Sequence, residues 1–403
     1  MDCLIHPAGD CAAAVPRTLS WPGMRLPCKT GSPVSPAEQP TSPAAPSADA
    51  PKPSKPPVLL RATLAEVVGS SMRVAGLSVI ERAIKQLHRQ KYHVVLASDG
   101  SCRLPPYLPA SVQVHKVPKP ENLTSLRREM SGAIEVGADE VRPSSDSLEG
   151  TVRVIDEASR RRAERAVFAD LLRGDLGFVA RYLNKPVSFF ITRHLLCSLP
   201  FTPNQVTLGA AVVGLAGALL VSSGGPALMV WGFFLAHLQS ILDGCDGELA
   251  RVRFQQSALG EWLDTLVDDG LNIVLFACIG VGIFRATGSS LALAAGLLNA
   301  AAHLLYDVVA YRELRLQGAG AEVIKVRWHL AGSPDMKARA AKRKRDLLVY
   351  VHSIGRRDFF ILAFLVYALV GVPWVALVHA LLIAWPLAVI AVAQVIWRAR
   401  GGN

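Results

Sequence analysis

The sequence predicts an all-α membrane domain of six transmembrane helices, preceded by a small α/β cytosolic domain and a disordered N-terminal tail. Three observations support this fold class: the composition, the spacing of apolar segments and the placement of basic residues. The chain of 403 residues is 51% hydrophobic yet carries a net charge of +11, which is typical of membrane proteins with basic cytosolic loops. The basic residues lie beside apolar segments without interleaved aromatic residues, so nucleic acid is not an expected partner.

Apolar segments of bilayer-spanning length begin after Thr202. We expect them at residues 204–222, 226–244, 260–284, 291–312, 347–370 and 373–397. The fifth is the least clear, because its apolar part is too short and the helix must start earlier. Residues 312–357 contain twelve Lys and Arg, whereas the three opposite turns contain only Arg285. This asymmetry predicts a multi-pass protein with its N-terminus and its basic loops in the cytosol. The expected location is the bacterial plasma membrane.

The first half of the chain divides by composition into three parts. Residues 1–57 are rich in Pro, Ala and Ser, contain no apolar signal-peptide core, and are expected to be disordered. Residues 58–165 are expected to form the α/β domain, because VIERAIKQLHRQ has helical periodicity and YHVVLASDG reads as a buried strand. Residues 166–201 mix apolar and basic residues, which predicts an amphipathic helix at the membrane surface. No CxxC pair indicates a zinc site or a disulfide framework.

Aspartates with helical spacing lie where the second and third apolar segments meet. Asp243 and Asp246 are three residues apart, and Asp264 and Asp268 are four apart, so each pair shares one face of a helix. Two antiparallel helices would bring these carboxylates together at the cytosolic membrane boundary. Converging carboxylates repel one another unless cations balance them. Two Mg²⁺ or Mn²⁺ ions are the expected cofactors, and a two-metal site indicates phosphoryl chemistry on a pyrophosphate substrate.

The alternative is a solvated acidic loop between two spans. Glu248, Glu261 and Asp269 are expected to belong to such a loop, and Cys245 is expected to be a small filler. Small residues accompany the aspartates: Gly247, Ala250 and Gly260. They would let a ligand approach the backbone, and Arg251, one turn after Gly247, suits a phosphate.

These residues carry a resemblance to a known family. DGCDGELAR, eight further residues and GEWLDTLVD match the pattern D-x2-D-G-x2-A-R-x8-G-x3-D-x3-D at every fixed position and spacing. The pattern is the signature of the CDP-alcohol phosphotransferases, and the resemblance covers about residues 165–400. It implies an enzyme that transfers a phosphoalcohol from a CDP-alcohol donor to a hydroxyl acceptor with release of CMP, and that forms a homodimer.

The resemblance also implies roles for individual residues. Asp243, Asp246, Asp264 and Asp268 would hold two metal ions, and Asp268 would also be the catalytic base. Gly247, Ala250, Arg251 and Gly260 would bind the CDP moiety. Asn204 has either an N-cap role or a site role. Arg356 and Arg357 are candidates for binding the acceptor or a phosphate, and the run Lys342–Arg345 is expected to set topology or attract lipid headgroups.

Further segments resemble one branch of this family. GDLGFVARYLNKPVSFFITRHLLCSLPFTPNQVTL and GRRDFF are similar to enzymes that join an inositol-phosphate cytidylyltransferase to a di-myo-inositol-phosphate phosphate synthase. VAGLSVIERAIKQLHRQKYHVVLAS resembles the early helix and strand of sugar-phosphate nucleotidyltransferases. A GxGxR-like loop is missing, since only VVGSSMR precedes this segment. Nothing would then cradle a triphosphate, which predicts a truncated, catalytically silent domain in residues 58–165.

Residues 202–403 are therefore expected to form a CDP-alcohol phosphotransferase domain of phospholipid synthesis. The leading expectation is transfer from CDP-diacylglycerol to inositol or inositol phosphate. A second is di-inositol phosphate synthesis from CDP-inositol and inositol phosphate, and a third is a membrane scaffold without activity. Among the other polar residues, Gln239 is expected to support the aspartates, and His303 and Asp307 to form a satisfied polar pair.

Overall fold

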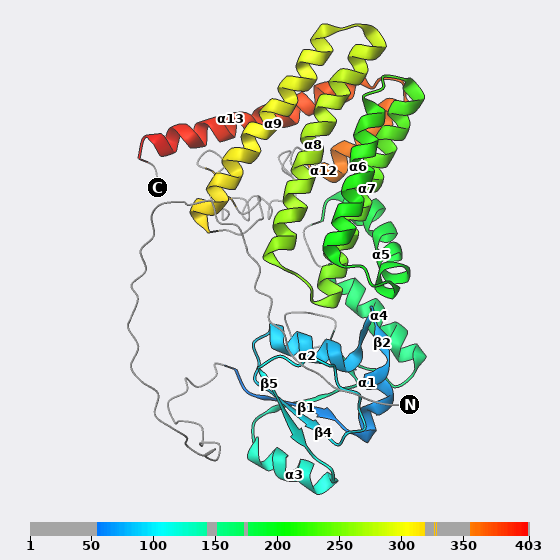
Figure 1. The fold of residues 1–403 in the computed structure, drawn as a ribbon, viewed down its shortest axis with the longest axis vertical. Coiled ribbons are helices and arrows are strands. Elements are labelled where there is room, and N and C mark those ends of the chain that lie inside the picture. Colours follow the sequence, from blue (N-terminus) through cyan, green and yellow to red (C-terminus); the bar gives the residue numbers. More distant parts are fainter. Residues whose placement is uncertain are drawn as a thin grey trace, which may run out of the picture. The chain divides into compact units, whose positions relative to one another are not determined.

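The computed structural model describes residues 55–142, 151–172, 176–318, 326, 328 and 355–401, with the backbone only at residues 64 and 67. The expected tail of residues 1–57 lies almost wholly outside this set, as does the basic run Lys342–Arg345. Within the described residues the chain is mostly helical, and an α/β region precedes the long helices (Figure 1).

The α/β region is built on a four-stranded parallel sheet with the order β5-β4-β1-β6. Its strands are β1 (Val58–Ala62), β4 (Val94–Ser98), β5 (Val112–Lys116) and β6 (Ile134–Gly137). In the register, Leu60 lies between Leu96 and Val136, and all three side chains are fully buried. Burial of both sheet faces explains why β4 reads as a continuous apolar run rather than an alternating one.

Helices cover both faces of this sheet. Ile80, Ile84 and Leu87 of α2 pack with Leu60 and Leu96 on one face. On the other face, Leu126 of α3 packs with Leu59 and Val95. The helices are α1 (Val67–Ser71), α2 (Val79–Arg89), α3 (Pro120–Glu129) and α4 (Glu157–Asp170), with a short 3-10 turn η1 (Leu64–Glu66). Two small antiparallel ladders complete the region: β2 (Arg73–Val74) with β3 (Leu77–Ser78), and β7 (Glu140–Val141) with β8 (Val152–Arg153).

The second half of the chain forms a helical domain with its own apolar core. Its helices are α6 (Pro203–Val221), α7 (Pro226–Arg253), α8 (Ala258–Thr287), α9 (Ser290–Gln317), α12 (Arg357–Leu369) and α13 (Trp374–Ala399). Phe233, Phe276 and Phe364 meet at the centre of the core and have no exposed surface. The apolar residues that point outward, such as Leu219 and Leu382, are suited to lipid contact.

Five of these helices are long and apolar enough to cross a membrane: α6, α7, α8, α9 and α13. The chain is therefore an integral membrane protein. The predicted fifth span, residues 347–370, is not among them. Its described part is α12, which has 13 residues, and a helix of that length is too short for a bilayer. Residues 347–354 lie outside the described set.

Helices α7 and α8 extend beyond the predicted spans. The second span was expected to end at residue 244, whereas α7 continues to Arg253; α8 begins at Ala258 rather than at residue 260. Ser257 caps α8 by accepting a hydrogen bond from the Gly260 backbone, as is usual at a helix start. The extra turns of α7 place Asp246 in the same regular helix as Asp243, where the spacing of the two side chains is fixed.

Close approach of α8 and α9 requires glycine at their crossing. A Cβ atom on Gly280 would lie 2.7 Å from the Cα atom of Gly296. We expect Gly280→Ala to lower the thermal unfolding midpoint in detergent, since overpacking costs about 1–3 kcal/mol. The matched control is Gly209→Ala on α6, where a Cβ atom meets nothing within 4 Å. This control should leave the midpoint unchanged or raise it; equal losses in both variants would contradict the prediction.

The predicted surface segment contains a π-helical turn η2 (Ala180–Asn184), α5 (Lys185–His194) and a 3-10 turn η3 (Leu196–Ser198). Its outward residues are large and apolar, as at Phe178, Tyr182 and Phe190. Its inward residues are polar, including Lys185 and Thr192. An exposed apolar face is consistent with a segment that lies on the membrane.

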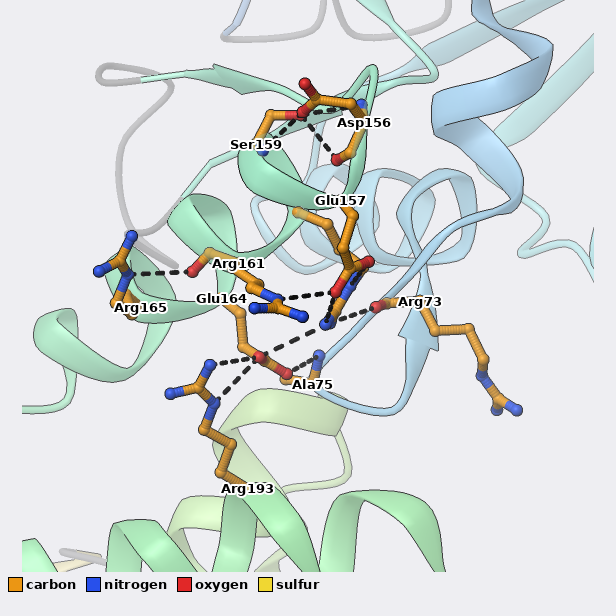
Figure 2. A network of polar contacts seen from close by, with 10 residues as sticks. Arg73, Ala75, Asp156, Glu157, Ser159, Arg161, Glu164, Arg165 and Arg193 are labelled. Carbon is orange, nitrogen blue, oxygen red and sulfur yellow. Dashed lines mark hydrogen bonds and ion pairs between the residues drawn. The ribbon is translucent and has the colours of Figure 1, made fainter.

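Polar contacts tie the α/β region to this segment (Figure 2). The Glu164 carboxylate on α4 accepts a hydrogen bond of 3.0 Å from Arg193 Nε on α5 and one of 3.4 Å from the Ala75 backbone. A second contact joins the α/β region to α7. The buried Arg82 of α2 donates to the Val252 carbonyl, near the end of α7, at 2.7 Å. Burial lowers the pKa of Arg82 to about 10, and its hydrogen bonds to carbonyls offset part of the desolvation cost.

Candidate metal centre and nucleotide pocket

Three of the predicted metal ligands converge between α7 and α8. Asp243 and Asp246 come from α7 and Asp264 from α8, and one carboxylate oxygen of each lies within 4.8 Å of the others. Each helix presents its aspartates on one face because three- and four-residue spacings return to the same side of the helix. The grouping is the one that the spacing predicts.

The carboxylate oxygens at this point fit a hard cation. Asp243 Oδ1 and Asp264 Oδ1 are buried, and neither has a hydrogen-bond partner among the described residues. An unpaired buried carboxylate oxygen is strongly unfavourable, and oxygen-only donor sets are those that Mg²⁺ and Mn²⁺ bind. Asp243, Asp246 and Asp264 could therefore hold a divalent cation.

Asp246 is fixed from a third helix. It is 5% exposed, and its Oδ2 atom accepts a hydrogen bond from the Thr207 hydroxyl on α6. Thr207 was not singled out in the sequence, although it lies in the TPNQVT segment at the start of α6. Threonine is common in apolar helices, so the residue type alone gives no signal that it contacts an aspartate.

Asp268 lies beside the other aspartates but has a different partner. It forms an ion pair with the Arg357 guanidinium at the start of α12. Arg357 Nη1 also lies 3.9 Å from Asp243 Oδ2. Its Nη2 donates to Gln239 at 2.7 Å and its Nε to Asn272 at 3.2 Å. Arg357 is thus held by several acceptors, and the expected supporting position of Gln239 is seen in the structure.

The two candidate arginines, Arg356 and Arg357, have different partners. Arg357 contacts the aspartates, whereas Arg356 Nε lies 3.4 Å from Asp358 Oδ1. Asp358 in turn accepts a hydrogen bond of 2.8 Å from the Ala180 backbone. Asp358 therefore joins α12 to the surface segment, and Arg356 pairs with Asp358. No contact in the described residues brings Arg356 to the aspartates.

A cavity of about 280 Å³ opens beside Asp246 and Asp264. Its lining contains every residue that was predicted to bind CDP, together with Asn204 and parts of the connection between α7 and α8: Asn204, Thr207, Gly247, Ala250, Arg251, Gln255, Gln256, Ser257, Gly260 and Glu261. The volume is close to that of small ligand pockets. The structure therefore brings the predicted metal ligands and the predicted nucleotide residues to one place.

Asn204 has a place in this cavity rather than at the helix cap. Thr202 is the N-cap of α6, and it forms a capping box with Gln205, so the N-cap role considered for Asn204 is wrong. A Cβ atom on Gly260 would lie 3.1 Å from Asn204 Oδ1. Glycine at 260 therefore keeps the wall open where α6 and α8 approach each other.

Arg251 is exposed and points along the cavity wall. A Cβ atom on Gly247 would lie 3.5 Å from its guanidinium, and no carboxylate in the described ranges forms an ion pair with it. An unpaired guanidinium next to the carboxylate cradle, which is formed by Asp243, Asp246 and Asp264, suits the phosphates of a nucleotide.

Glu248 corrects an expectation from the sequence. It was expected in a solvated loop, yet it is fully buried. Lys185 donates to Glu248 at 2.7 Å, Ser188 at 2.6 Å and Thr192 at 2.8 Å. Glu248 thus anchors α5 to α7 and points away from the cavity, while Cys245 beside it is fully buried as the expected filler.

Part of the chain resembles a known protein family. The model of the CDP-alcohol phosphatidyltransferase family matches residues 201–390. This part of the chain is therefore similar to the CDP-alcohol phosphatidyltransferase family. The match includes α6 to α9, α12 and most of α13, and hence all four aspartates.

Curated relatives point to one branch of this family. A "Bifunctional IPC transferase and DIPP synthase" of Aquifex aeolicus is 30% identical over 226 residues, which is 56% of this chain and 45% of the relative. Proteins of the same name from Rubrobacter xylanophilus and Thermococcus kodakarensis are 36% identical over 159 and 121 residues. Those matches cover 40% and 29% of this chain, and 34% and 27% of the relatives. The chain thus spans less than half the length of the curated relatives that it matches.

Proposed function

We propose that the protein is a CDP-alcohol phosphotransferase that moves a phosphoalcohol from a CDP-alcohol to a hydroxyl acceptor and releases CMP. The observation that carries this proposal is the joining of a carboxylate cradle to a cavity lined by Arg251, Gly247 and Gly260. Such a combination would bring a bound cation next to the phosphates of a nucleotide. No aspartate of the family signature is missing, which argues against a silent scaffold.

The proposed reaction assigns a role to each of the predicted site residues. Asp243, Asp246 and Asp264 would hold Mg²⁺ or Mn²⁺, with Asp268 completing the site, and the bound ions would stabilise the developing negative charge on the pyrophosphate. Arg251 would bind a phosphate, and the small residues would admit the cytidine nucleotide. Asp268 would take the proton of the acceptor hydroxyl. The acceptor oxygen then forms a bond to the phosphorus that carries the donor alcohol, and the bond to CMP breaks.

Arg357 has a part in this scheme that the sequence alone did not define. Its guanidinium holds Asp268 and lies near Asp243, so it would keep the Asp268 side chain in position while the site is free. It would also be available to an acceptor phosphate when the pair opens. Arg356 is assigned to the attachment of α12 and is not proposed as a binding residue.

We propose an inositol-type acceptor, with CDP-diacylglycerol as the first candidate donor. The names of the relatives favour a second candidate, a DIPP synthase reaction in which CDP-inositol is the donor. We further propose a homodimer in the bacterial plasma membrane with the aspartates on the cytosolic side, since most Lys and Arg flank that end of the helices.

The α/β region is proposed to be a remnant of a nucleotidyltransferase. Its parallel sheet and helices on both faces suit such an ancestry. It lacks a glycine-rich phosphate loop, so we propose a supporting role without cytidylyl transfer.

A labelled-donor assay tests the proposed function. The purified chain in detergent is incubated with CDP-diacylglycerol or CDP-inositol, Mg²⁺, and inositol or inositol phosphate. We expect CMP release with one donor, complete loss on addition of a chelator, and recovery on addition of Mg²⁺ or Mn²⁺. The product identifies the donor and the acceptor. Absence of CMP release with both donors and both acceptors would contradict the proposal.

A further inference from the structure

A second group of metal-ligating side chains lies between α8 and α9, outside the residues used by the proposed reaction. It consists of Asp269 on α8 with His303 and Asp307 on α9, and their candidate ligand atoms lie within 4.8 Å of one another. His303 and Asp307 are four residues apart and share one helix face, a spacing with which one helix offers two ligands to one ion. Asp269 follows Asp268 in sequence, but it accepts a hydrogen bond of 2.6 Å from Tyr311 on α9.

Three polar atoms of His303 and Asp307 lack hydrogen-bond partners among the described residues. Both ring nitrogens of His303 and the Oδ2 atom of Asp307 are buried without a hydrogen bond in the described part of the chain. His303 is 6% exposed and Asp307 3%. The distance from His303 Nε2 to Asp307 Oδ2 is 3.8 Å, which is too long for a hydrogen bond. The expected satisfied polar pair is therefore wrong, and both side chains are open to a common ligand.

The surroundings favour a cation as that ligand. Within the described ranges, no Lys or Arg nitrogen lies at ion-pair distance from Asp269 or Asp307, and Arg357 pairs with Asp268 instead. The ring of Phe276 packs against His303 at 5.4 Å between centroids, so the site is apolar on that side. Buried carboxylates are normally paired or bound to metal. A divalent cation would neutralise both carboxylates, and the imidazole would bind it as a neutral donor.

We propose that Asp269, His303 and Asp307 form a binding site for a divalent transition metal, separate from the four aspartates of the proposed reaction. One nitrogen and two carboxylate donors suit Zn²⁺ or Mn²⁺, whereas Mg²⁺ prefers oxygen and water. The ion would join α8 to α9 one residue beyond Asp268. Because the donor sets differ, the two sites can be told apart by spectroscopy without any measurement of activity.

The test is pulsed electron paramagnetic resonance of Mn²⁺ bound to the full-length protein in detergent. The signature aspartates offer only oxygen, so coupling to a histidine nitrogen would report the proposed site alone. We expect wild-type protein to show this coupling and to bind about one more Mn²⁺ per chain than His303→Gln. Asp307→Asn should weaken the coupling, and Asp264→Asn should retain it even if CMP release is lost.

The matched control is His237→Gln. His237 is also 6% exposed and has an unpartnered ring nitrogen, but it lies on α7 outside the cluster. This variant should keep the histidine coupling and the Mn²⁺ stoichiometry of wild type. The proposal is overturned if wild-type protein saturated with Mn²⁺ shows no nitrogen coupling, or if the coupling persists in His303→Gln. If His303→Gln does not fold, the wild-type spectrum and Asp307→Asn decide the question in the same way.

Discussion

Replacement of Asp268 by asparagine is expected to lower CMP release by about 10²–10⁴-fold, the usual contribution of a positioned general base. Asparagine keeps the size of the side chain but cannot accept the acceptor proton. The carboxylate cradle of Asp243, Asp246 and Asp264 does not include this residue, so metal should still bind there. The rate is measured as CMP formed per chain, with Mn²⁺ binding measured on the same preparation.

The control for this prediction is Glu129→Gln on α3. Glu129 is exposed and lies in the α/β region, so the same change of a carboxylate to an amide should leave the rate near that of wild type. An Asp268→Asn protein that is folded and as active as wild type would remove Asp268 from the reaction.

Replacement of Lys185 by methionine is expected to destabilise the protein by about 3–5 kcal/mol, because it leaves the buried Glu248 carboxylate without its cation. Glu248 has no exposed surface, and Lys185 lies 2.7 Å from it. The effect is measured as a fall in the thermal unfolding midpoint in detergent. The double variant Lys185→Met/Glu248→Gln should recover most of the loss, since the amide oxygen can still accept from Ser188 and the amide NH2 can donate to the Thr192 hydroxyl.

An exposed ion pair provides the comparison. Lys85 and Glu81 on α2 lie 2.8 Å apart at the surface, and such pairs contribute about 0–1 kcal/mol. Lys85→Met should therefore barely change the midpoint. If Lys185→Met behaves like Lys85→Met, the contact with Glu248 does not stabilise the folded state, and α5 is held to α7 by its apolar contacts.

Much of the helical domain could be predicted because the bilayer imposes a length and a composition on each span. The predicted starts at residues 204 and 226 lie within one residue of α6 and α7. The signature aspartates could be grouped because helical spacing fixes which side chains share a face. The β4 strand and the α2 helix were likewise visible as a buried apolar run and as amphipathic periodicity.

The rest depended on contacts between segments distant in sequence, which periodicity does not encode. In the sequence, Glu248 cannot be distinguished from its acidic neighbours. It differs from them because Lys185 of α5, about 60 residues earlier in the chain, pairs with it. Thr207 becomes informative only when α6 packs beside Asp246. His303 and Asp307 share a helix face, yet their side chains do not bond to each other. The fifth predicted span was uncertain for a different reason, since its apolar run was short in the sequence itself.

Two arginines that contact the end of α7 or lie in it, Arg82 and Arg253, show how the halves of the chain depend on each other. Arg253 donates to the carbonyls of Leu196, Cys197, Leu199 and Phe201, and Arg82 of the α/β region donates to that of Val252. The helix that carries Asp243 and Asp246 is therefore completed by a side chain from a domain without a phosphate loop. Loss of the α/β region would leave the Val252 carbonyl without its buried donor. The stability of this end of α7 thus depends on a residue about 160 positions before the aspartates.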